Sequence, residues 1–468
     1  MKKRKIFLIV GPLLYVLCVL ALPKGIFATM ESRSAIGTMV WMALWWLLAL
    51  VDYAVTAFLP IAINAIVPMI DMSTLIANYA AETIILLLGA SILTASWEIT
   101  GLDRRIAAAV LKMVGDNIRK QLIFWFLVSA ILSAMLPNVV VCATITPIAV
   151  AMLKYIGEGD IKESNIGSKI LLTIVYAVGV GGLFSPLGGA MNLVTINYIE
   201  ELTGKEYIYI DWVIKFAPVI IVLVISNILF LLRGVKKDMV LQGASEYFVQ
   251  EHNKLDKLTY EEVCSLVLFV AATVLSFTRQ LYQQFFPGLK PAYIFLICAI
   301  ISFTISNKEG DRIVVWKNVQ HKIVWELIYI FAGGLAVGAL INKSGAASDI
   351  GKAVANIGIS GGIGLIFIII LITILLSDVT SNTATAAVAI PIVISVVNGI
   401  GLNPIPYIYV ASIGVNLSYM LPTSIRAIPV GYGLSPRYMF KEGYKITIIV
   451  LILMTVLSYV LVEKIAYF

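Results

Sequence analysis

Long apolar runs alternate with short polar stretches along the whole chain. The runs at residues 6–22, 214–232 and 363–376 are continuous, whereas the strands of a membrane barrel alternate apolar and polar positions. Inside a bilayer every backbone polar group needs a partner within the protein, and a helix supplies that partner in each run by itself. The pattern therefore predicts an all-α, polytopic membrane protein.

Composition and charge agree with a membrane protein. Of 468 residues, 60% are hydrophobic and 13% are charged, against about a quarter charged in soluble proteins. The net charge of +7 is typical of basic residues gathered in cytoplasmic loops, so we expect no nucleic-acid partner. Lys2, Lys3, Arg4 and Lys5 precede the first apolar run. We expect a cytoplasmic N-terminus and a place in a cell membrane, the cytoplasmic membrane of a bacterium.

The longest polar stretch, residues 233–262, divides the chain near its middle. Its mixed charges and few apolar positions indicate a cytoplasmic linker. We therefore divide the chain into a first half at residues 1–232, this linker, and a second half at residues 263–468.

The two halves repeat each other at one constant offset. Asn138 and Asn382 are 244 residues apart (382 minus 138), and five further pairs of identical residues share that spacing. These pairs are Glu82 with Glu326, Gly89 with Gly333, Gly101 with Gly345, Ser133 with Ser377, and Pro147 with Pro391. Most are polar or helix-breaking, and weak internal symmetry of this kind is typical of secondary transporters.

Each half also contains glycine, proline and polar residues in the middle of apolar sequence. Pro137-Asn138 and the glycine-rich residues 182–192 interrupt the first half, and residues 377–391 and 404–433 repeat this composition in the second. Such breaks free backbone groups that lipid cannot pair, so they must face protein, water or a ligand. Helices that begin at such a break point partial positive charge inward, which suits an anion, and freed carbonyl and hydroxyl oxygens suit a cation such as sodium.

The residues of the second break resemble a known family. Ser381-Asn382-Thr383, preceded by Ser377-Asp378, is similar to a signature of the divalent anion:sodium symporter family, within the ion transporter superfamily. That family carries Ser-Asn-Thr at the tip of each of two re-entrant hairpins. The resemblance implies about eleven transmembrane helices in two inverted repeats, each with a hairpin and a broken helix. It also implies a scaffold domain and a transport domain, a homodimer, elevator motion, and dicarboxylate or tricarboxylate substrates.

The resemblance assigns the site residues one by one. It places the hairpin tips at residues 137–139 and 381–383, and the broken helices near residues 182–192 and 421–427. The substrate residues it implies are Asn138, Gly189, Asn192, Ser381, Asn382, Thr383, Thr423 and Arg426. It implies a first sodium site, with fewer ligands, at Ser133, Asn138 and Gly188, and a second sodium site at Ser377, Asn382 and Pro422. No other cofactor is expected.

The chain departs from that family at two places. Pro137 and Val139 stand where the first tip of the family has Ser and Thr, so two hydroxyls are lost and the first sodium site is incomplete. Arg426 stands where the second broken helix of the family has an asparagine. An unpaired charge inside a membrane is costly, so the arginine either replaces a sodium ion and neutralises a bound dianion, or pairs with an acid such as Asp378 and fixes the fold.

From these residues we predict a carrier of C4 and C5 dicarboxylates of the succinate, malate, fumarate and 2-oxoglutarate type. A fixed positive charge at Arg426 favours exchange of one dicarboxylate for another by an elevator-like mechanism. Sodium-coupled symport is the first alternative, and a cation/proton antiporter that uses Asp52, Glu98 or Asp378 is the second. The chain shows no Ser/His, Cys/His or metal-ligand motif, so we do not expect an enzyme.

Overall fold

The computed structural model describes residues 2–111, 115–158, 160–253, 255, 257–307, 310–355 and 361–468. Within these ranges helices dominate, and the only extended pairings are two isolated bridges, Asn117 with Val240 and Ser306 with Arg312. Nine described helices are long and apolar enough to cross a membrane, and four shorter apolar helices accompany them. The prediction of an all-α, polytopic membrane protein is confirmed.

The first half of the chain contains the helices up to α12. Their bounds are α1 (Lys2–Ala21), α2 (Met30–Leu48), α3 (Tyr53–Thr56), α4 (Leu59–Ile66), α5 (Met72–Ala77), α6 (Glu82–Thr100), α7 (Leu102–Leu111), α8 (Ile118–Met135), α9 (Asn138–Tyr155), α10 (Asn165–Gly182), α11 (Ala190–Thr203) and α12 (Tyr209–Leu232).

The polar linker contains one short helix, and the second half follows it. The bounds are α13 (Ala244–Asn253), α14 (Tyr260–Phe277), α15 (Pro291–Ser302), α16 (Trp316–Val319), α17 (Trp325–Lys343), α18 (Ala346–Ala355), α19 (Ile363–Val379), α20 (Asn382–Gly399), α21 (Pro404–Asn416), α22 (Ala427–Gly431) and α23 (Pro436–Tyr459). Residues 254 and 256 of the predicted linker lie outside the described residues.

The internal repeat is visible in the helix bounds. At the offset of 244 residues, α9 coincides with α20 at both ends, α7 and α18 begin at matching positions, and α6 and α17 agree to within one residue. The pairs α8/α9 and α19/α20 are hairpins whose tips are residues 136–137 and 380–381. Both tips fall within two residues of the predicted positions, because Pro137 and Ser381 each begin the following helix as its N-cap.

A broken helix follows each hairpin. In the first half, α10 ends at Gly182 and α11 begins at Ala190, with a 3₁₀ turn at Pro186–Gly188 between them. In the second half, α21 ends at Asn416, and the chain resumes helical structure at Ser424–Arg426 and α22. Ser424 has a φ of 51°, a conformation that residues other than glycine adopt rarely. Such backbone is typical of functional sites.

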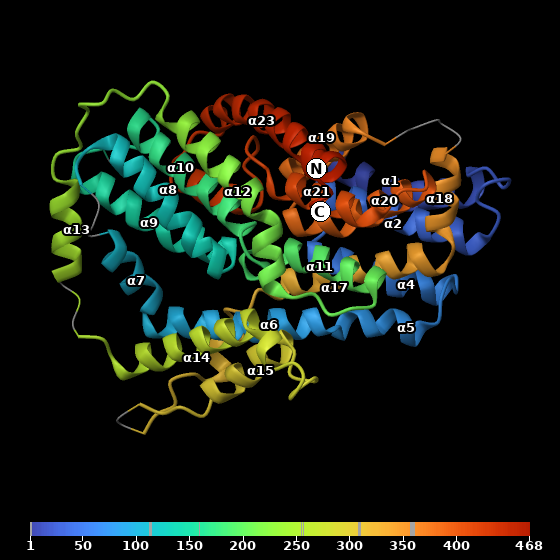
Figure 1. The fold of residues 1–468 in the computed structure, drawn as a ribbon, viewed down its shortest axis with the longest axis horizontal. Helices are drawn as coiled ribbons and strands as arrows, with labels where there is room; N and C mark the ends of the chain where they lie inside the picture. The colour runs from blue at the N-terminus through green and yellow to red at the C-terminus, as the bar shows by residue number, and fades with distance from the viewer. Residues whose placement is uncertain are drawn as a thin grey trace.

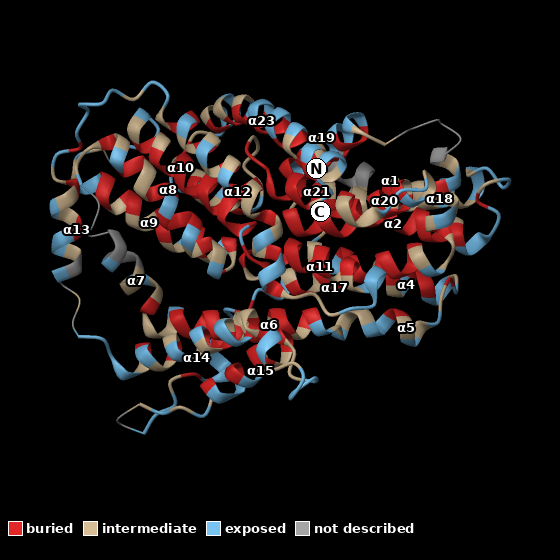
Figure 2. Cartoon of the chain, in the orientation of Figure 1, coloured by how far each residue is buried: buried red, intermediate tan, exposed pale blue. Residues whose placement is uncertain are grey.

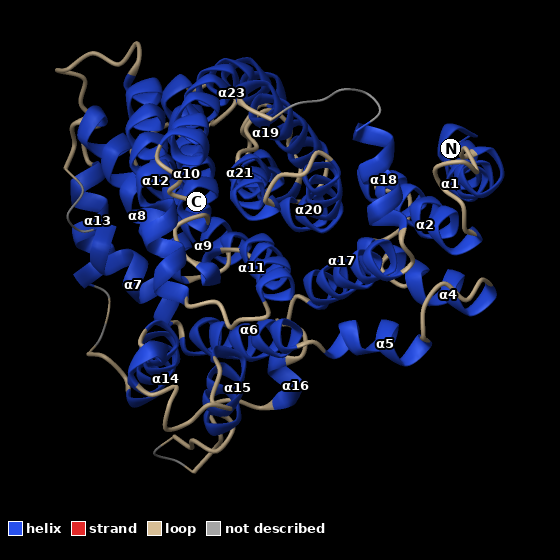
Figure 3. Ribbon diagram, turned by 45° about the vertical axis from the view of Figure 1, so that its right-hand side comes forward, coloured by secondary structure: helices blue, strands red, loops and turns tan. Residues whose placement is uncertain are grey.

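The helices α10, α11, α20 and α21 form most of the interior, whereas α8 and α19 of the hairpins expose apolar side chains such as Ile131 and Ile372. Figures 1 and 3 show α20 and α21 surrounded by other helices, while α14 and α15 pack beside α6 at one edge. Figure 2 shows the same contrast in burial, because α20 is largely buried whereas α14 has many exposed and half-buried residues. The apolar surface of α14, including Val267 and Val274, is exposed, as suits contact with lipid or another subunit.

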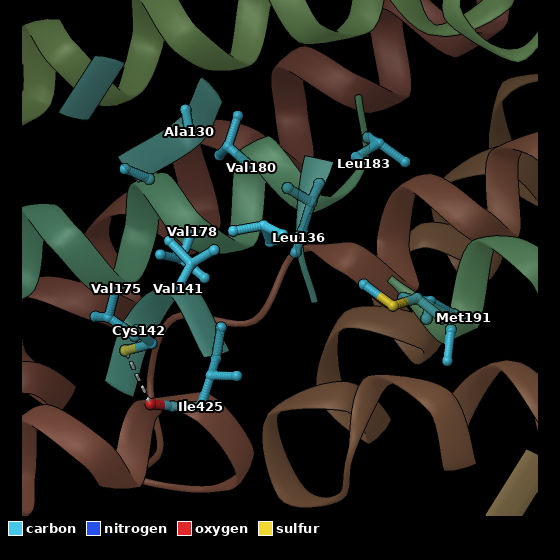
Figure 4. Packing of buried hydrophobic residues seen from close by; sticks show 14 of the residues in the cluster. Ala130, Leu136, Val141, Cys142, Val175, Val178, Val180, Leu183, Met191 and Ile425 are labelled. Atoms are coloured by element: carbon cyan, nitrogen blue, oxygen red, sulfur yellow. Dashed lines mark hydrogen bonds between the residues drawn. The ribbon is translucent and has the colours of Figure 1, made fainter. Parts of the chain in front are cut away.

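Small residues allow the first hairpin to pack tightly. A Cβ on Gly181 would collide with the backbone of Ala130, so the absence of a side chain lets α10 approach α8. Figure 4 shows the apolar core around this contact, and it shows Cys142 of α9 directed at Ile425 beside the second break. The Cys142 sulfur lies 3.6 Å from the Ile425 carbonyl oxygen. The first hairpin therefore packs directly against the second broken helix.

Candidate functional site

A cavity of about 270 Å³ lies where the two hairpin tips meet the two breaks. It is small for a ligand pocket, since sites for drug-sized molecules exceed roughly 300 Å³. Five of the substrate residues expected from the sequence line it: Asn138, Gly189, Ser381, Asn382 and Thr383. Ser424 and Ile425, at the second break, also line it.

The same hydrogen-bonded motif supports both tips. Ser133 Oγ lies 2.7 Å from Asn138 Oδ1 and 2.8 Å from the Val178 carbonyl oxygen. In the second half, Ser377 Oγ lies 2.7 Å from Asn382 Oδ1 and 2.6 Å from the Val415 carbonyl oxygen. Each motif joins the two helices of a hairpin to the following broken helix.

The motif has two chemical consequences. A serine hydroxyl has one proton to donate, so the three oxygens at the first tip attract a further proton or a cation, whereas at the second tip Ser418 Oγ also donates to Asn382 Oδ1. With Oδ1 turned inward, the side-chain amide nitrogens of Asn138 and Asn382 have no acceptor among the described residues, and both residues line the cavity. Each tip therefore presents one amide donor to a ligand.

Backbone N–H groups at two helix N-termini are further hydrogen-bond donors beside the side-chain amides of Asn138 and Asn382. α9 begins at Asn138 and α20 begins at Asn382, and the first N–H groups of a helix have no partner within it. Ser381 Oγ caps α20 by accepting from Ala384 N at 3.1 Å, whereas the N-terminus of α9 has no side-chain cap because Pro137 occupies the N-cap position. A helix N-terminus carries about half a positive charge, so the two tips together suit a substrate with two negative ends.

Arg426 lies behind the second tip and does not line the cavity. Its side chain is 1% exposed. The guanidinium donates to the carbonyl oxygens of Leu421 (2.7 Å), Ser418 (3.2 Å) and Ser377 (3.2 Å), to Thr423 Oγ1 (2.7 Å), and to Ser418 Oγ. Ser418 Oγ in turn lies 3.2 Å from Asn382 Oδ1. The guanidinium thus lies among the oxygens that surround the second tip motif.

Asp378 compensates the charge of Arg426. The two side chains are 4.0 Å apart and each is 1% exposed. Asp378 Oδ1 also accepts from the backbone nitrogens of Tyr419 (2.9 Å) and Met420 (2.8 Å). The arginine and the aspartate therefore both hold the loop of the second break, which is the arrangement expected of a pair that fixes this part of the fold.

The remaining sequence-predicted residues also lie behind the cavity wall. Asn192 is fully buried and donates to the carbonyl oxygens of Gly182 (2.6 Å) and Ser185 (2.8 Å), so it ties the first break together. Thr423 Oγ1 donates to the Asp378 carbonyl oxygen at 2.7 Å. A Cβ on Gly188 would lie 2.6 Å from the Ser133 carbonyl oxygen, which places this glycine beside the first tip motif. Pro422 lies half-buried in the second loop.

The cavity is also lined by residues that the family resemblance did not assign to the substrate site. These are Tyr53, Glu98, Lys322 and Glu326, and Lys322 Nζ lies 2.7 Å from Glu98 Oε2. The sequence named Glu326 as part of the repeat and Glu98 as the acid of a possible cation/proton antiporter, whereas no sequence pattern pointed to Tyr53 or Lys322. Nearby on α7, burial raises the pKa of the Asp103 carboxyl.

Comparison with known proteins gives one family and several relatives. Residues 41–414 match the model of a citrate transporter family. The chain is 26% identical to the sodium-dependent dicarboxylate transporter SdcS of Staphylococcus saprophyticus, over 98% of this chain and 91% of that protein. It is 28% identical to the SdcS of Staphylococcus aureus strain RF122, over 98% of this chain and 92% of that protein.

Two solved structures share the fold. The YdaH transporter of Alcanivorax borkumensis superposes with a TM-score of 0.54 at 13% identity, over 83% of this chain and 87% of that one. MtrF of Neisseria gonorrhoeae, described as one of a class of antimetabolite efflux pumps, superposes with a TM-score of 0.50 at 13% identity, over 83% of each chain.

Proposed function

Because this chain belongs to the citrate transporter family, we propose that it is a secondary carrier of C4 and C5 dicarboxylates such as succinate, malate, fumarate and 2-oxoglutarate. The observation that carries the proposal is the pair of opposed tips. Each offers a side-chain amide, from Asn138 or Asn382, and the start of a helix to a cavity of about 270 Å³. One carboxylate binds at each tip, and the names of the relatives support this substrate class.

In this proposal the guanidinium of Arg426 takes the place of a sodium ion at the second tip. Arg426 donates to Ser377 O, Ser418 O and Thr423 Oγ1, oxygens of the kind that a sodium ion at Ser377, Asn382 and Pro422 would use. The guanidinium holds the second tip in its binding geometry without sodium. The positive charge is permanent because arginine does not lose its proton in proteins.

We propose exchange of one dicarboxylate for another as the transport mode. The side-chain amide nitrogens of Asn138 and Asn382 line the cavity and have no acceptor among the described residues. In this proposal a substrate carboxylate accepts from each of them. The loaded carrier therefore crosses the membrane more readily than the empty one, and transport runs with substrate in both directions.

Sodium-coupled symport is the second candidate, and the first tip favours it. Ser133 Oγ, Asn138 Oδ1 and the Val178 carbonyl oxygen share one hydroxyl proton, and Gly182 rather than a hydroxyl residue lies against the Asn138 carboxamide. Sodium binds such oxygen sets, and the relatives are named as sodium-dependent. In this alternative, sodium would bind at the first tip only and hold it in the geometry that binds a carboxylate.

The wider arrangement is also part of the proposal. Hairpins α8/α9 and α19/α20 with their broken helices form a transport domain that moves as an elevator against the scaffold of α6, α14, α15 and α17. The halves at residues 1–232 and 263–468 are inverted repeats joined by a cytoplasmic linker at residues 233–262. The protein is a homodimer in the bacterial cytoplasmic membrane, with its N-terminus inside.

Counterflow in liposomes distinguishes dicarboxylate exchange, sodium-coupled symport and cation/proton antiport. Purified protein is reconstituted with or without internal unlabelled succinate, and uptake of labelled succinate is followed in sodium or in choline medium. Exchange predicts uptake that needs internal dicarboxylate and ignores sodium. Sodium-driven uptake into empty vesicles establishes symport instead. Proton-driven sodium flux without any carboxylate flux contradicts the substrate class and favours a cation/proton antiporter.

A further inference from the structure

A second cavity adjoins the substrate cavity, and we name it the vestibule. It lies between α9 of the first hairpin, α7, and α13 of the linker, and its lining includes Asp103, Arg104, Thr144 and Tyr247. Three residues line both cavities: Glu98, Val140 and Lys322. The vestibule therefore meets the substrate cavity at these three side chains.

The junction is an ion pair on the wall opposite the hairpins. Glu98 lies near the end of α6, and Lys322 lies between α16 and α17. Lys322 Nζ is 2.7 Å from Glu98 Oε2, and the two side chains are 36% and 33% exposed. Water screens a pair that is this exposed, so its partners exchange easily for others.

The charges around the junction single out Lys322. The vestibule presents the acids Glu98, Asp103 and Glu251 and the bases Arg104 and Lys322. Among the described residues that line the substrate cavity, Lys322 has the only basic side chain. A dianion that passes from the vestibule to the tips meets repulsion from the acids, and Lys322 is the one cation that touches both spaces.

We propose that Lys322 passes the dicarboxylate between the vestibule and the substrate cavity by exchanging the Glu98 carboxylate for a carboxylate of the substrate. Glu98 neutralises the lysine between passages and displaces the departing substrate. Lys322 is thus a positioning residue for entry and release on the vestibule side. This inference rests on the proposed dicarboxylate transport.

Sided kinetics of succinate exchange test the inference. In membrane vesicles of both orientations, Lys322→Gln is expected to raise the KM for succinate on the vestibule side about tenfold, the lower range of electrostatic steering, with a smaller effect on kcat. Lys322→Arg keeps the charge and restores the KM. Glu98→Gln leaves the lysine without its carboxylate, so it lowers that KM and slows release. These effects shrink at high ionic strength because salt screens the charges.

A matched ion pair at the other end of α6 provides the control. Lys290 Nζ lies 2.9 Å from Glu82 Oε2 with similar exposures of 37% and 46%, and neither residue lines the substrate cavity or the vestibule. Glu82→Gln and Lys290→Gln are expected to leave the KM unchanged on both sides. If Lys322→Gln does not fold, the neutral double variant E98Q/K322Q is measured instead. We expect it to raise the KM for succinate on the vestibule side.

The outcomes distinguish the inference from its premise. An unchanged KM in folded Lys322→Gln or in the double variant overturns the role of Lys322 while wild-type succinate exchange still supports the proposed function. An equal rise in Lys290→Gln, or an equal rise on both sides of the membrane, overturns it as well. Wild-type protein that moves no dicarboxylate overturns the proposed function itself.

Discussion

Arg426 and Asp378 are a buried pair of charges inside a predominantly apolar protein. Burial of two charges is costly, and their attraction offsets this cost only when further hydrogen bonds satisfy both groups. The guanidinium donates to five oxygens, and Asp378 Oδ1 accepts from backbone nitrogens of the second loop, whereas Asp378 Oδ2 is buried without a hydrogen-bond partner among the described residues. The pair therefore fixes the second break, and it holds the guanidinium behind the second tip with Asp378 as its counter-charge.

The stability of single and double variants measures the Arg426–Asp378 pair. Arg426→Gln leaves the buried carboxylate without its cation and is expected to lower the free energy of unfolding by about 3 kcal/mol or more. In the double variant R426Q/D378N the loss is smaller than the sum of the two single losses by about 1 kcal/mol or more. Unfolding of the detergent-solubilised protein measures these values, and strictly additive losses contradict the pairing.

Val139 makes the first tip less polar than the second. It is 44% exposed, lines the cavity, and takes the place that Thr383 holds at the second tip. Val139→Thr is expected to add one hydrogen bond to a substrate carboxylate. A bond to a charged group contributes about 1.5–3 kcal/mol, so the KM for succinate falls about tenfold.

Exchange kinetics of Val139→Thr, with Val139→Ala as the control, check this assignment of the first tip. The alanine variant adds no donor, and its KM stays near that of the wild type. An equal KM in the threonine variant and the wild type would show that the substrate carboxylate does not reach residue 139.

At the scale of elements, close packing positions both tips. A Cβ on Gly181 collides with the Ala130 backbone, whereas the nearest atom to a Cβ on Gly179, the Asn416 carbonyl oxygen, lies 3.9 Å away. The two glycines are on the same helix, α10, but only Gly181 is at the contact with α8. Only one of them is therefore needed for the hairpin to pack.

This contrast gives a matched pair of variants. Gly181→Ala is expected to separate α10 from α8 and to destabilise the protein by about 2 kcal/mol, within the usual cost of overpacking. Gly179→Ala finds room and is expected to be neutral or to stabilise by about 0.5 kcal/mol, since alanine favours the helix. Thermal unfolding of both variants measures the difference, and equal losses contradict the packing of the hairpin.

The helices and their breaks were predictable from the sequence, whereas the contacts of Arg426 and the pairing of Glu98 with Lys322 were not. Continuous apolar runs predicted helices, and Pro137, Ser381 and the glycines near residue 182 marked breaks because lipid cannot pair freed backbone groups. The sequence alone does not show where the Arg426 side chain points. Its guanidinium could donate to Ser377 and Ser418 or to a ligand. The pairing of Lys322 with Glu98 was not predictable, because only the three-dimensional fold brings these two residues together.

At the scale of the whole molecule, the repeat provides two similar tips with different surroundings. Both tips have the same serine, asparagine and carbonyl motif. Only the second has an arginine among its oxygens, and only the second keeps the hydroxyls of Ser381 and Thr383. The two tips thus share one motif but differ in the polar groups around it, and in the proposed function the arginine takes the place of sodium at the second tip.

The sodium dependence of succinate exchange in wild type and in Arg426→Asn tests this account most directly. Initial rates of labelled succinate exchange are measured in liposomes while sodium replaces choline. The account predicts that the wild type is insensitive to sodium, and that the variant, whose second tip has lost its guanidinium, exchanges slowly in choline and recovers with sodium. A wild type that requires sodium, or a variant that still exchanges at the wild-type rate without it, would contradict the claim that Arg426 replaces a cation.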